Sequence, residues 1–235
     1  MNKIVSALVL AGMVSAPGVV MAEETSPHTV TGNLSFVTDY RYRGVSQTDE
    51  GMAIQGGFDY AHSSGFYLGT WASNVEASFL NGANIEMDFY GGYAFNLGDV
   101  AVNVGGLYYA YPGQVGGPGT VDIDTFELYA GATWKWLNVK YSHATTDFFG
   151  IPDSDGSYYL ETNVSVPLPM DISLALHYGY QKVEGVVGDD DIGDWKIGLS
   201  KSILGFNMGL AYVDTDVDNI DLADDTVVFS VGKTF

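Results

Sequence analysis

The sequence of 235 residues lacks cysteine altogether, which excludes disulfide frameworks and metal sites built from thiolates. Basic residues are scarce, with 9 Lys and Arg against 29 Asp and Glu and a formal net charge of −20. So few cations cannot form the basic stripe that nucleic-acid binding requires. Beyond the N-terminus there is no run of about 18 apolar residues, the length of a transmembrane helix. Aromatic residues make up 14 % of the chain, which excludes an acidic disordered protein and leaves one large β-rich domain.

The N-terminus has the pattern of a secretory signal peptide. Lys3 supplies a positive start, Ile4 to Val14 are mostly apolar, and 20–22 (Val-Met-Ala) resemble a cleavage site. The apolar stretch is too short for a membrane anchor, and the alternative is a buried strand or helix of the fold. We predict a cleaved signal peptide over 1–22, a short periplasmic segment over 23–32, and a single domain over 33–235.

From Asn33 onward, apolar and polar residues alternate with the period of a β-strand. In one segment Ile85, Met87 and Phe89 alternate with Glu86 and Asp88, and similar segments recur to the C-terminus. The pattern indicates about twelve strands, within a range of roughly 10 to 14.

The connections between these segments alternate strictly between short and long. Short connections lie near 62–65, 96–99, 167–171 and 202–205, and long polar ones at 44–52, 74–84, 112–120, 146–157, 183–194 and 214–225. Outer-membrane barrels combine short periplasmic turns with long extracellular loops. The prediction is therefore an all-β, transmembrane, antiparallel up-and-down β-barrel with long acidic extracellular loops. A secreted or periplasmic β-sandwich is the alternative.

Several blocks of sequence resemble the TorF-type porin family of proteobacteria. They are Thr38 to Thr48 (TDYRYRGVSQT), Gln55 to His62, Gly69 to Val75 and the closing Phe229 to Phe235. Tyr42 stands where many relatives have Phe. The resemblance implies a barrel in the outer membrane of a Gram-negative cell. It does not extend to the acidic loops 189–194 and 214–225.

Charged residues on the polar face of the strands are candidates for lining the barrel's lumen, because charge on the lipid-facing side costs several kcal/mol at the membrane midplane. The candidates are Asp39, Arg41, Arg43, Asp59, Glu86, Asp88, Glu127, Lys140, Glu161 and Lys196. One interpretation is that Arg41 and Arg43 face acids across an open channel and orient a permeating solute. The other is a salt-bridge network that fills the barrel and fixes strand register.

A second group of acids is expected at the extracellular mouth. Its members are Asp189, Asp190, Asp191, Asp194, Asp214, Asp216, Asp218 and Asp221. Asp214, Asp216 and Asp218 resemble the start of a calcium loop, but Asn219 replaces the glycine of that loop and Asp225 replaces its glutamate. A solvated acidic rim that gathers cations is the better interpretation.

We expect no enzyme, no catalytic residue and no cofactor. Ser142 and His143 are adjacent, so on a strand they point to opposite faces and cannot form a nucleophile–base pair. The predicted function is passive diffusion of small solutes or ions, with a cation preference set at the acidic mouth. The alternative is a non-conducting structural or recognition barrel whose lumen its own side chains plug. Expected partners are outer-membrane lipid and lipopolysaccharide, and the barrel-assembly machinery through the terminal Phe235 strand; nucleic acid is not expected.

Overall fold

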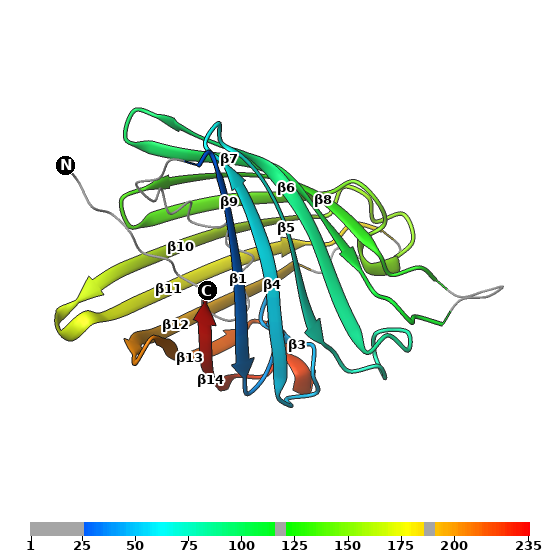
Figure 1. The fold of residues 1–235 in the computed structure, drawn as a ribbon. Helices are drawn as coiled ribbons and strands as arrows, with labels where there is room; N and C mark the ends of the chain where they lie inside the picture. The colour runs from blue at the N-terminus through cyan, green and yellow to red at the C-terminus, as the bar shows by residue number, and fades with distance from the viewer. Residues whose placement is uncertain (1–25, 116–120, 186–190) are drawn as a thin grey trace.

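A computed structural model describes residues 26–115, 121–185 and 191–235, in which twelve long strands close into an antiparallel barrel (Figure 1). The predicted signal peptide lies outside the described residues. The long strands are β1 (His28–Val37), β4 (Ala53–His62), β5 (Phe66–Asn74), β6 (Ile85–Leu97), β7 (Val100–Ala110), β8 (Thr125–Trp134), β9 (Leu137–Ala144), β10 (Tyr158–Leu168), β11 (Ile172–Lys182), β12 (Asp191–Ile203), β13 (Phe206–Thr215) and β14 (Thr226–Thr234). The predicted fold class and strand number are confirmed.

Each long strand pairs with the next one along the chain, and β1 closes the ring by pairing with β14. The β1–β14 register runs from Asn33 opposite Thr234 to Val37 opposite Ser230. Phe235 extends this seam, because its backbone N–H and C=O bond to Gly32 at 2.9 and 2.8 Å. Closure leaves no long strand with an unpaired edge, the usual liability of a β-sheet.

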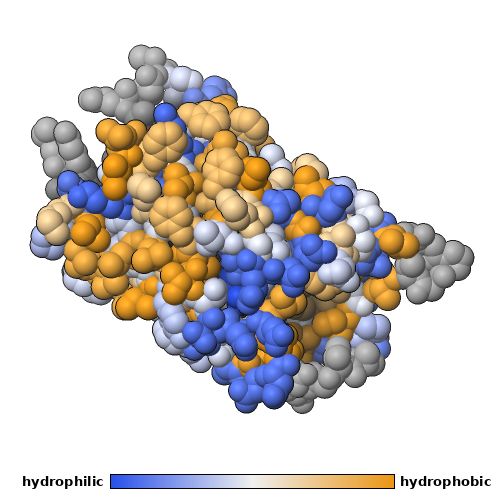
Figure 2. Space-filling model, turned by 90° about the horizontal axis from the view of Figure 1, so that it is seen from below, coloured by the Kyte–Doolittle hydropathy of each residue, from blue (hydrophilic) through white to orange (hydrophobic). Residues whose placement is uncertain are grey.

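The outward faces of the strands are apolar. On β12, for example, Trp195, Ile197 and Leu199 are exposed, while Asp194, the residue before Trp195, is buried. Phe58 and Leu68 are each 60 % exposed, far more than large apolar side chains of a water-soluble core would be. Figure 2 shows such side chains gathered over a broad area of the wall, separate from a hydrophilic area. Among the described residues, no helix is long and apolar enough to cross a membrane.

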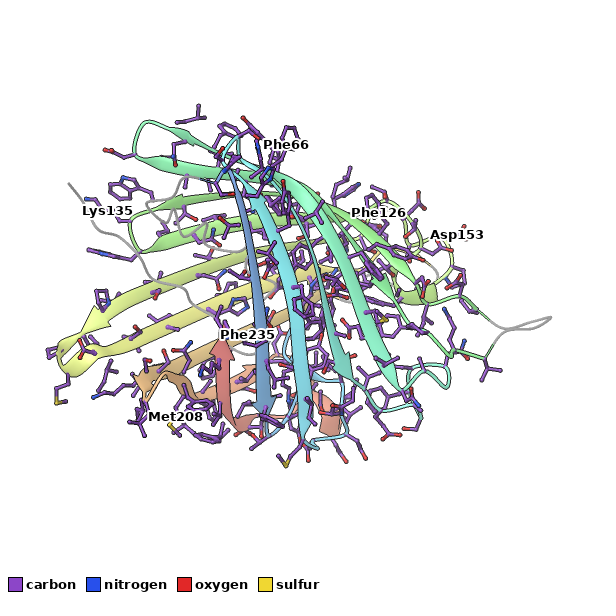
Figure 3. The ribbon with its side chains drawn as sticks, in the orientation of Figure 1. Phe66, Phe126, Lys135, Asp153, Met208 and Phe235 are labelled. Carbon is purple, nitrogen blue, oxygen red and sulfur yellow. The ribbon has the colours of Figure 1, made fainter. Side chains whose placement is uncertain are left out.

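The short and long connections lie at opposite rims of the barrel. The short-turn rim holds residues 63–65, 98–99, 135–136 and 204–205 and the 3-10 turn η2 (Pro169–Asp171). The long-loop rim holds 38–52, 75–84, 145–157 with η1 (Phe148–Gly150), 216–225 with η3 (Asp221–Ala223), and the described parts of 111–124 and 183–190. Lys135 and Asp153 mark the two rims in Figure 3.

The first strand differs from the expectation. It begins at His28, so 28–32 belong to the barrel wall and not to a periplasmic segment, and it ends at Val37. The chain then forms a small hairpin from β2 (Arg41–Tyr42) and β3 (Val45–Ser46) before β4 begins. The apolar–polar alternation of Tyr40 to Arg43 is typical of a wall strand. In the structure the segment folds inward instead, and Asp39, Tyr40 and Arg41 are all buried in succession.

Candidate functional site: a luminal constriction

Residues 38–52, which we call the luminal hairpin, fold into the barrel at the long-loop rim. Asp39 holds the hairpin together, since its carboxylate accepts hydrogen bonds from Ser46 Oγ at 2.6 Å and Thr48 Oγ1 at 3.2 Å. Ser46 is fully buried. The backbone N–H of Gln47 bonds to the C=O of Tyr40 at 2.7 Å. The hairpin is therefore a built element with its own polar interior.

Arg43 joins the tip of this hairpin to the far wall. Its Nη2 donates to both carboxylate oxygens of Glu127 on β8 at 2.7 and 2.8 Å, and its Nη1 donates to Gln181 on β11. The guanidinium also lies 4.3 Å from the ring centre of Tyr159 on β10, a cation–π contact. Counted from β1, β8 is the fifth strand one way round and β11 the fourth the other way. The hairpin thus crosses the whole lumen.

Arg41 fixes the opposite side of the hairpin. Its Nε lies 2.5 Å from Asp39, and its Nη1 donates to the carbonyls of Leu222 and Asp224 at 2.9 Å each. These carbonyls belong to the loop between β13 and β14. Both Asp39 and Arg41 are buried inside the rim, and they bind each other and a loop instead of an acid across an open path. Their role in lining a path stays a prediction.

The buried phenols and the guanidinium of the hairpin region keep their ordinary charge states. Burial raises the pKa of Tyr40 and of Tyr42 well above the usual value, so both hydroxyls stay neutral donors. Burial, the largest single effect, would lower the pKa of Arg43, but the Glu127 carboxylate together with Tyr42 and Tyr109 outweighs it and holds the pKa above the usual value. Arg43 and Glu127 are therefore an ion pair, with side chains only 9 % and 2 % exposed.

Glu86 and Asp88 form a pair of buried acids beneath Tyr40. Both side chains point inward from β6, and each residue is 1 % exposed. Tyr40 Oη donates to Glu86 Oε1 at 3.1 Å. The other oxygen of Glu86 and both oxygens of Asp88 have no hydrogen-bond partner.

A second polar network joins β9 to β12. Glu161 accepts from Lys140 at 3.0 Å and from Asn163 at 2.9 Å. His177 contacts Asn163 at 2.7 Å and Asp194 at 2.9 Å. Tyr159 donates to Asp194 at 2.7 Å, and because its ring also contacts the guanidinium of Arg43, it links this network to the luminal hairpin. Lys196 lies directly across from His177 in the strand register and faces the same space.

Gly179 makes this network possible. A Cβ at this position would overlap Tyr159 Oη and Asp194 Oδ2. Only a glycine at this inward position of β11 leaves room for the phenol to reach Asp194. Alternation in the sequence gives no reason to expect this network, and no local pattern indicates the roles of Gly179 and Gln181.

Small side chains occupy many inward positions in the half of the barrel nearer the short-turn rim, and tyrosine rings fill part of the space that they leave: a Cβ at Gly92 would meet Tyr67 Oη, and one at Gly105 would meet Tyr129 Oη. Inward positions in this half include Gly57, Gly92, Gly105, Gly131, Ser165, Ser173, Gly198, Ser200, Gly209 and Ser230. Asp59 lies deeper than the hairpin and accepts from Tyr90 at 2.5 Å. The luminal hairpin thus narrows the long-loop half, and the hydrogen-bonded rings of Tyr67 and Tyr129 occupy part of the lumen below it.

The predicted acidic mouth is only partly assembled as expected. Asp194 is buried in the luminal network, because the exposed Trp195 forces its neighbours to face inward. Asp191 lies at the start of β12, where it pairs with Lys182 at 3.1 Å and accepts from Tyr180. Asp216, Asp218 and Asp221 are exposed in the loop after β13. Asp189 and Asp190 lie outside the described residues.

The proposed calcium triplet does not converge on one point. Asp214 is the penultimate residue of β13 and its Oδ1 accepts from the backbone N–H of Thr215, whereas Asp216 Oδ1 accepts from the backbone N–H of Gly193 on β12. In the described parts of the chain, no group of three or more His, Asp or Glu side chains is arranged to hold a metal ion. The strand pattern also separates Ser142, buried in the lumen, from His143 on the outer face.

Closed antiparallel topology, an apolar outer face and a charged lumen define a porin-like β-barrel. Solved porins share the fold: the KdgM porin superposes with a TM-score of 0.55 at 9 % identity, covering 87 % of this chain and 98 % of that one. The NanC porin gives 0.54 at 12 % identity, with coverage of 88 % and 98 %. A KdgM porin in complex with disordered oligogalacturonate gives 0.53 at 9 % identity, with coverage of 88 % and 97 %.

The chain belongs to the family described as "Bacterial protein of unknown function (Gcw_chp)", whose profile matches residues 21–235. No curated protein matches the sequence. The expected resemblance is therefore confirmed as far as a porin-like barrel, while the TorF name stays a prediction.

Proposed function

We propose that this protein is an outer-membrane channel for small solutes whose path is narrowed by the luminal hairpin. The observation that carries the proposal is the closed barrel with apolar residues outside and ionised residues inside. Such a wall can be buried in lipid without unsatisfied backbone groups, and its lumen offers a polar path. Small inward side chains near the short-turn rim, such as Ser173, Ser200 and Ser230, favour a polar path at that end of the lumen.

A cation preference is the second part of the proposal. The inward face of the barrel and the luminal hairpin together carry seven acids and four Lys or Arg. The acids are Asp39, Asp59, Glu86, Asp88, Glu127, Glu161 and Asp194, and the bases are Arg41, Arg43, Lys140 and Lys196. The sequence placed the excess acid at the mouth and a near balance in the lumen. With Asp194 inside, the wall itself is acidic and would favour cations along the path as well as at the mouth.

Reconstitution of the purified protein in a planar lipid bilayer tests conduction directly. We expect stepwise increases of current on insertion of single barrels. Silence across a wide range of voltage and salt, with barrels shown to be folded, would contradict the channel.

A non-conducting barrel is the second candidate, and one observation favours it. The hairpin crosses the lumen and is bonded through Arg43 to the wall at β8 and through Arg41 to the loop between β13 and β14. In that case the long loops of the outer rim would carry a recognition or structural role, and the hairpin would be a permanent plug.

Location and partners follow from the same proposal. The apolar wall would contact outer-membrane lipid and lipopolysaccharide, and the seam strand ending in Phe235 would be what the barrel-assembly machinery binds. The predicted absence of catalysis and of a cofactor belongs to this proposal too.

A further inference from the structure

We propose that Glu86 and Asp88 form a binding site for one divalent cation beneath Tyr40 of the luminal hairpin, with Ca²⁺ as the matching ion. This site is separate from the predicted calcium triplet of the loop after β13. It goes beyond the channel proposal, because occupancy of the site can be measured whether or not the barrel conducts.

The two carboxylates are positioned to share one ligand. Glu86 and Asp88 are two residues apart on β6, so both point into the lumen from the same face of the strand. Their Cα atoms are separated by about 7 Å, a distance that two carboxylate side chains can bridge to a common ion. Both residues are sealed from solvent at 1 % exposure.

Three of the four carboxylate oxygens lack a partner. Glu86 Oε2 and Asp88 Oδ1 and Oδ2 accept no hydrogen bond, and neither residue forms an ion pair with any described Lys, Arg or His. The guanidinium groups of the hairpin are committed elsewhere, Arg41 to Asp39 and Arg43 to Glu127. A buried carboxylate without a partner is strongly unfavourable, so a cation or a proton must neutralise the pair.

The surrounding groups suit a hard cation. Ca²⁺ takes about 6 to 8 oxygen ligands, and each carboxylate can bind through both oxygens. The register places Ser73 opposite Glu86 and sets Asp88 between Trp71 and Tyr109. The hydroxyl of Tyr40 donates to Glu86, and Ser73 brings a second hydroxyl to the same face of the neighbouring strand. A charge of −2 matched by one divalent ion leaves the site neutral.

The ion would also strengthen the hairpin's attachment. Tyr40 bonds to Glu86 at 3.1 Å and packs edge-on against Trp71, with ring centres 5.4 Å apart. Tyr40 therefore covers the carboxylates as a lid formed by the hairpin. A cation that holds Glu86 in place would hold Tyr40 with it.

The test is calcium binding by the intact protein, folded in detergent, stripped with EDTA and titrated with CaCl₂ in a calorimeter at pH 7.5. We expect the double variant E86Q/D88N, which keeps the side-chain shapes, to weaken the tightest Ca²⁺ binding at least about tenfold. The matched control is D59N, because Asp59 is also a luminal carboxylate but has Tyr90 as partner. D59N should bind Ca²⁺ as the wild type does.

Terbium luminescence gives a second readout, in which the W71F variant separates the luminal site from acids near Trp195, the tryptophan opposite Asp214. Trp71 lies across from Asp88, so exciting tryptophan should sensitise Tb³⁺ at this site, and W71F should lower the emission without removing Ca²⁺ binding. Equal Ca²⁺ binding by wild type and E86Q/D88N would overturn the proposal. So would folded wild type that binds no Ca²⁺, an outcome that would assign a shared proton to the pair.

Discussion

Arg43 is the residue that turns a loop into a constriction. The residue has a φ of 47° and the following Gly44 a φ of 85°, so the chain reverses at this point and aims the guanidinium at the far wall. The guanidinium donates hydrogen bonds to Glu127 and Gln181 and lies against the ring of Tyr159. A bidentate pair of this kind is specific to arginine, whose planar fork matches a carboxylate.

Replacing Arg43 with alanine should destabilise the barrel and free the hairpin. The change leaves Glu127 buried and unpaired, for which about 3 kcal/mol is a typical cost. Urea unfolding in lipid vesicles measures the loss, and hydrogen exchange over 38–52 should become faster.

The control for this variant is the double substitution R43A/E127Q, which removes the stranded charge as well. Part of the lost stability should return, while exchange in the hairpin should stay fast. If R43A unfolds at the same urea concentration as the wild type, the Arg43–Glu127 pair does not stabilise the barrel.

Gly179 offers a second test at this scale. In G179A the new methyl group must push Tyr159 away from Asp194, and overpacking of this kind costs about 1 to 3 kcal/mol. Gly198 on the neighbouring strand is the matched control, since a Cβ there would meet Ala211 Cβ at 3.3 Å, which a small shift relieves. A larger loss of thermal stability in G198A than in G179A would contradict the packing described for the luminal network.

At the scale of elements, alternation predicted the wall well and the hairpin badly. Period two is sufficient for β12, where Trp195, Ile197 and Leu199 face out, and it places Lys196 correctly inside. The same alternation places Asp194 inside once β12 is taken to begin at Asp191 rather than at Trp195. Tyr40, Arg41 and Arg43 were expected on the first strand. Their inward fold depends on partners such as Glu127 that lie far away in sequence, and no local pattern encodes those.

The β1–β14 seam is the element whose closure depends on the last residue. Val37 to Asn33 pair with 230–234, and Phe235 then adds its two backbone bonds to Gly32 and lays its ring against that glycine. Deleting Phe235 removes both bonds from the one junction that joins the two ends of the sheet.

We therefore expect deletion of Phe235 to lower the fraction of folded barrel and its resistance to heat in detergent. The change in gel mobility on heating measures both. F206A, which removes another exposed aromatic near the same rim, should have a smaller effect. Equal effects of the two changes would indicate loss of general apolar surface and not of the seam.

On the scale of the whole molecule, the acidity of the chain is divided between the loops and the lumen. The exposed Asp216, Asp218 and Asp221 belong to the outer loops, whereas Glu86, Asp88 and Asp194 are inside. Charges in the lumen are partly buried, so salt screens them less than it screens the exposed charges of the loops. The account thus assigns most of any cation preference to the interior, in contrast to the expectation from sequence.

Reversal potentials across a salt gradient separate the two sources. D216N/D218N/D221N should leave most of the cation preference of the wild type in place. K196E, which adds luminal acid at a half-buried position, should increase it. If D216N/D218N/D221N alone abolishes the cation preference, the acids of the extracellular loops set the selectivity, and the luminal acids do not.

The most direct test of the constriction is to remove the luminal hairpin and measure single-channel conductance. Val37 and Ala53 are paired neighbours in the register, so an Asn-Gly turn can replace 38–52 and join β1 to β4 as a tight hairpin. The account predicts a folded barrel that conducts severalfold more than the wild type. Equal conductance, or equal silence, of the two folded barrels in the same bilayer would contradict it.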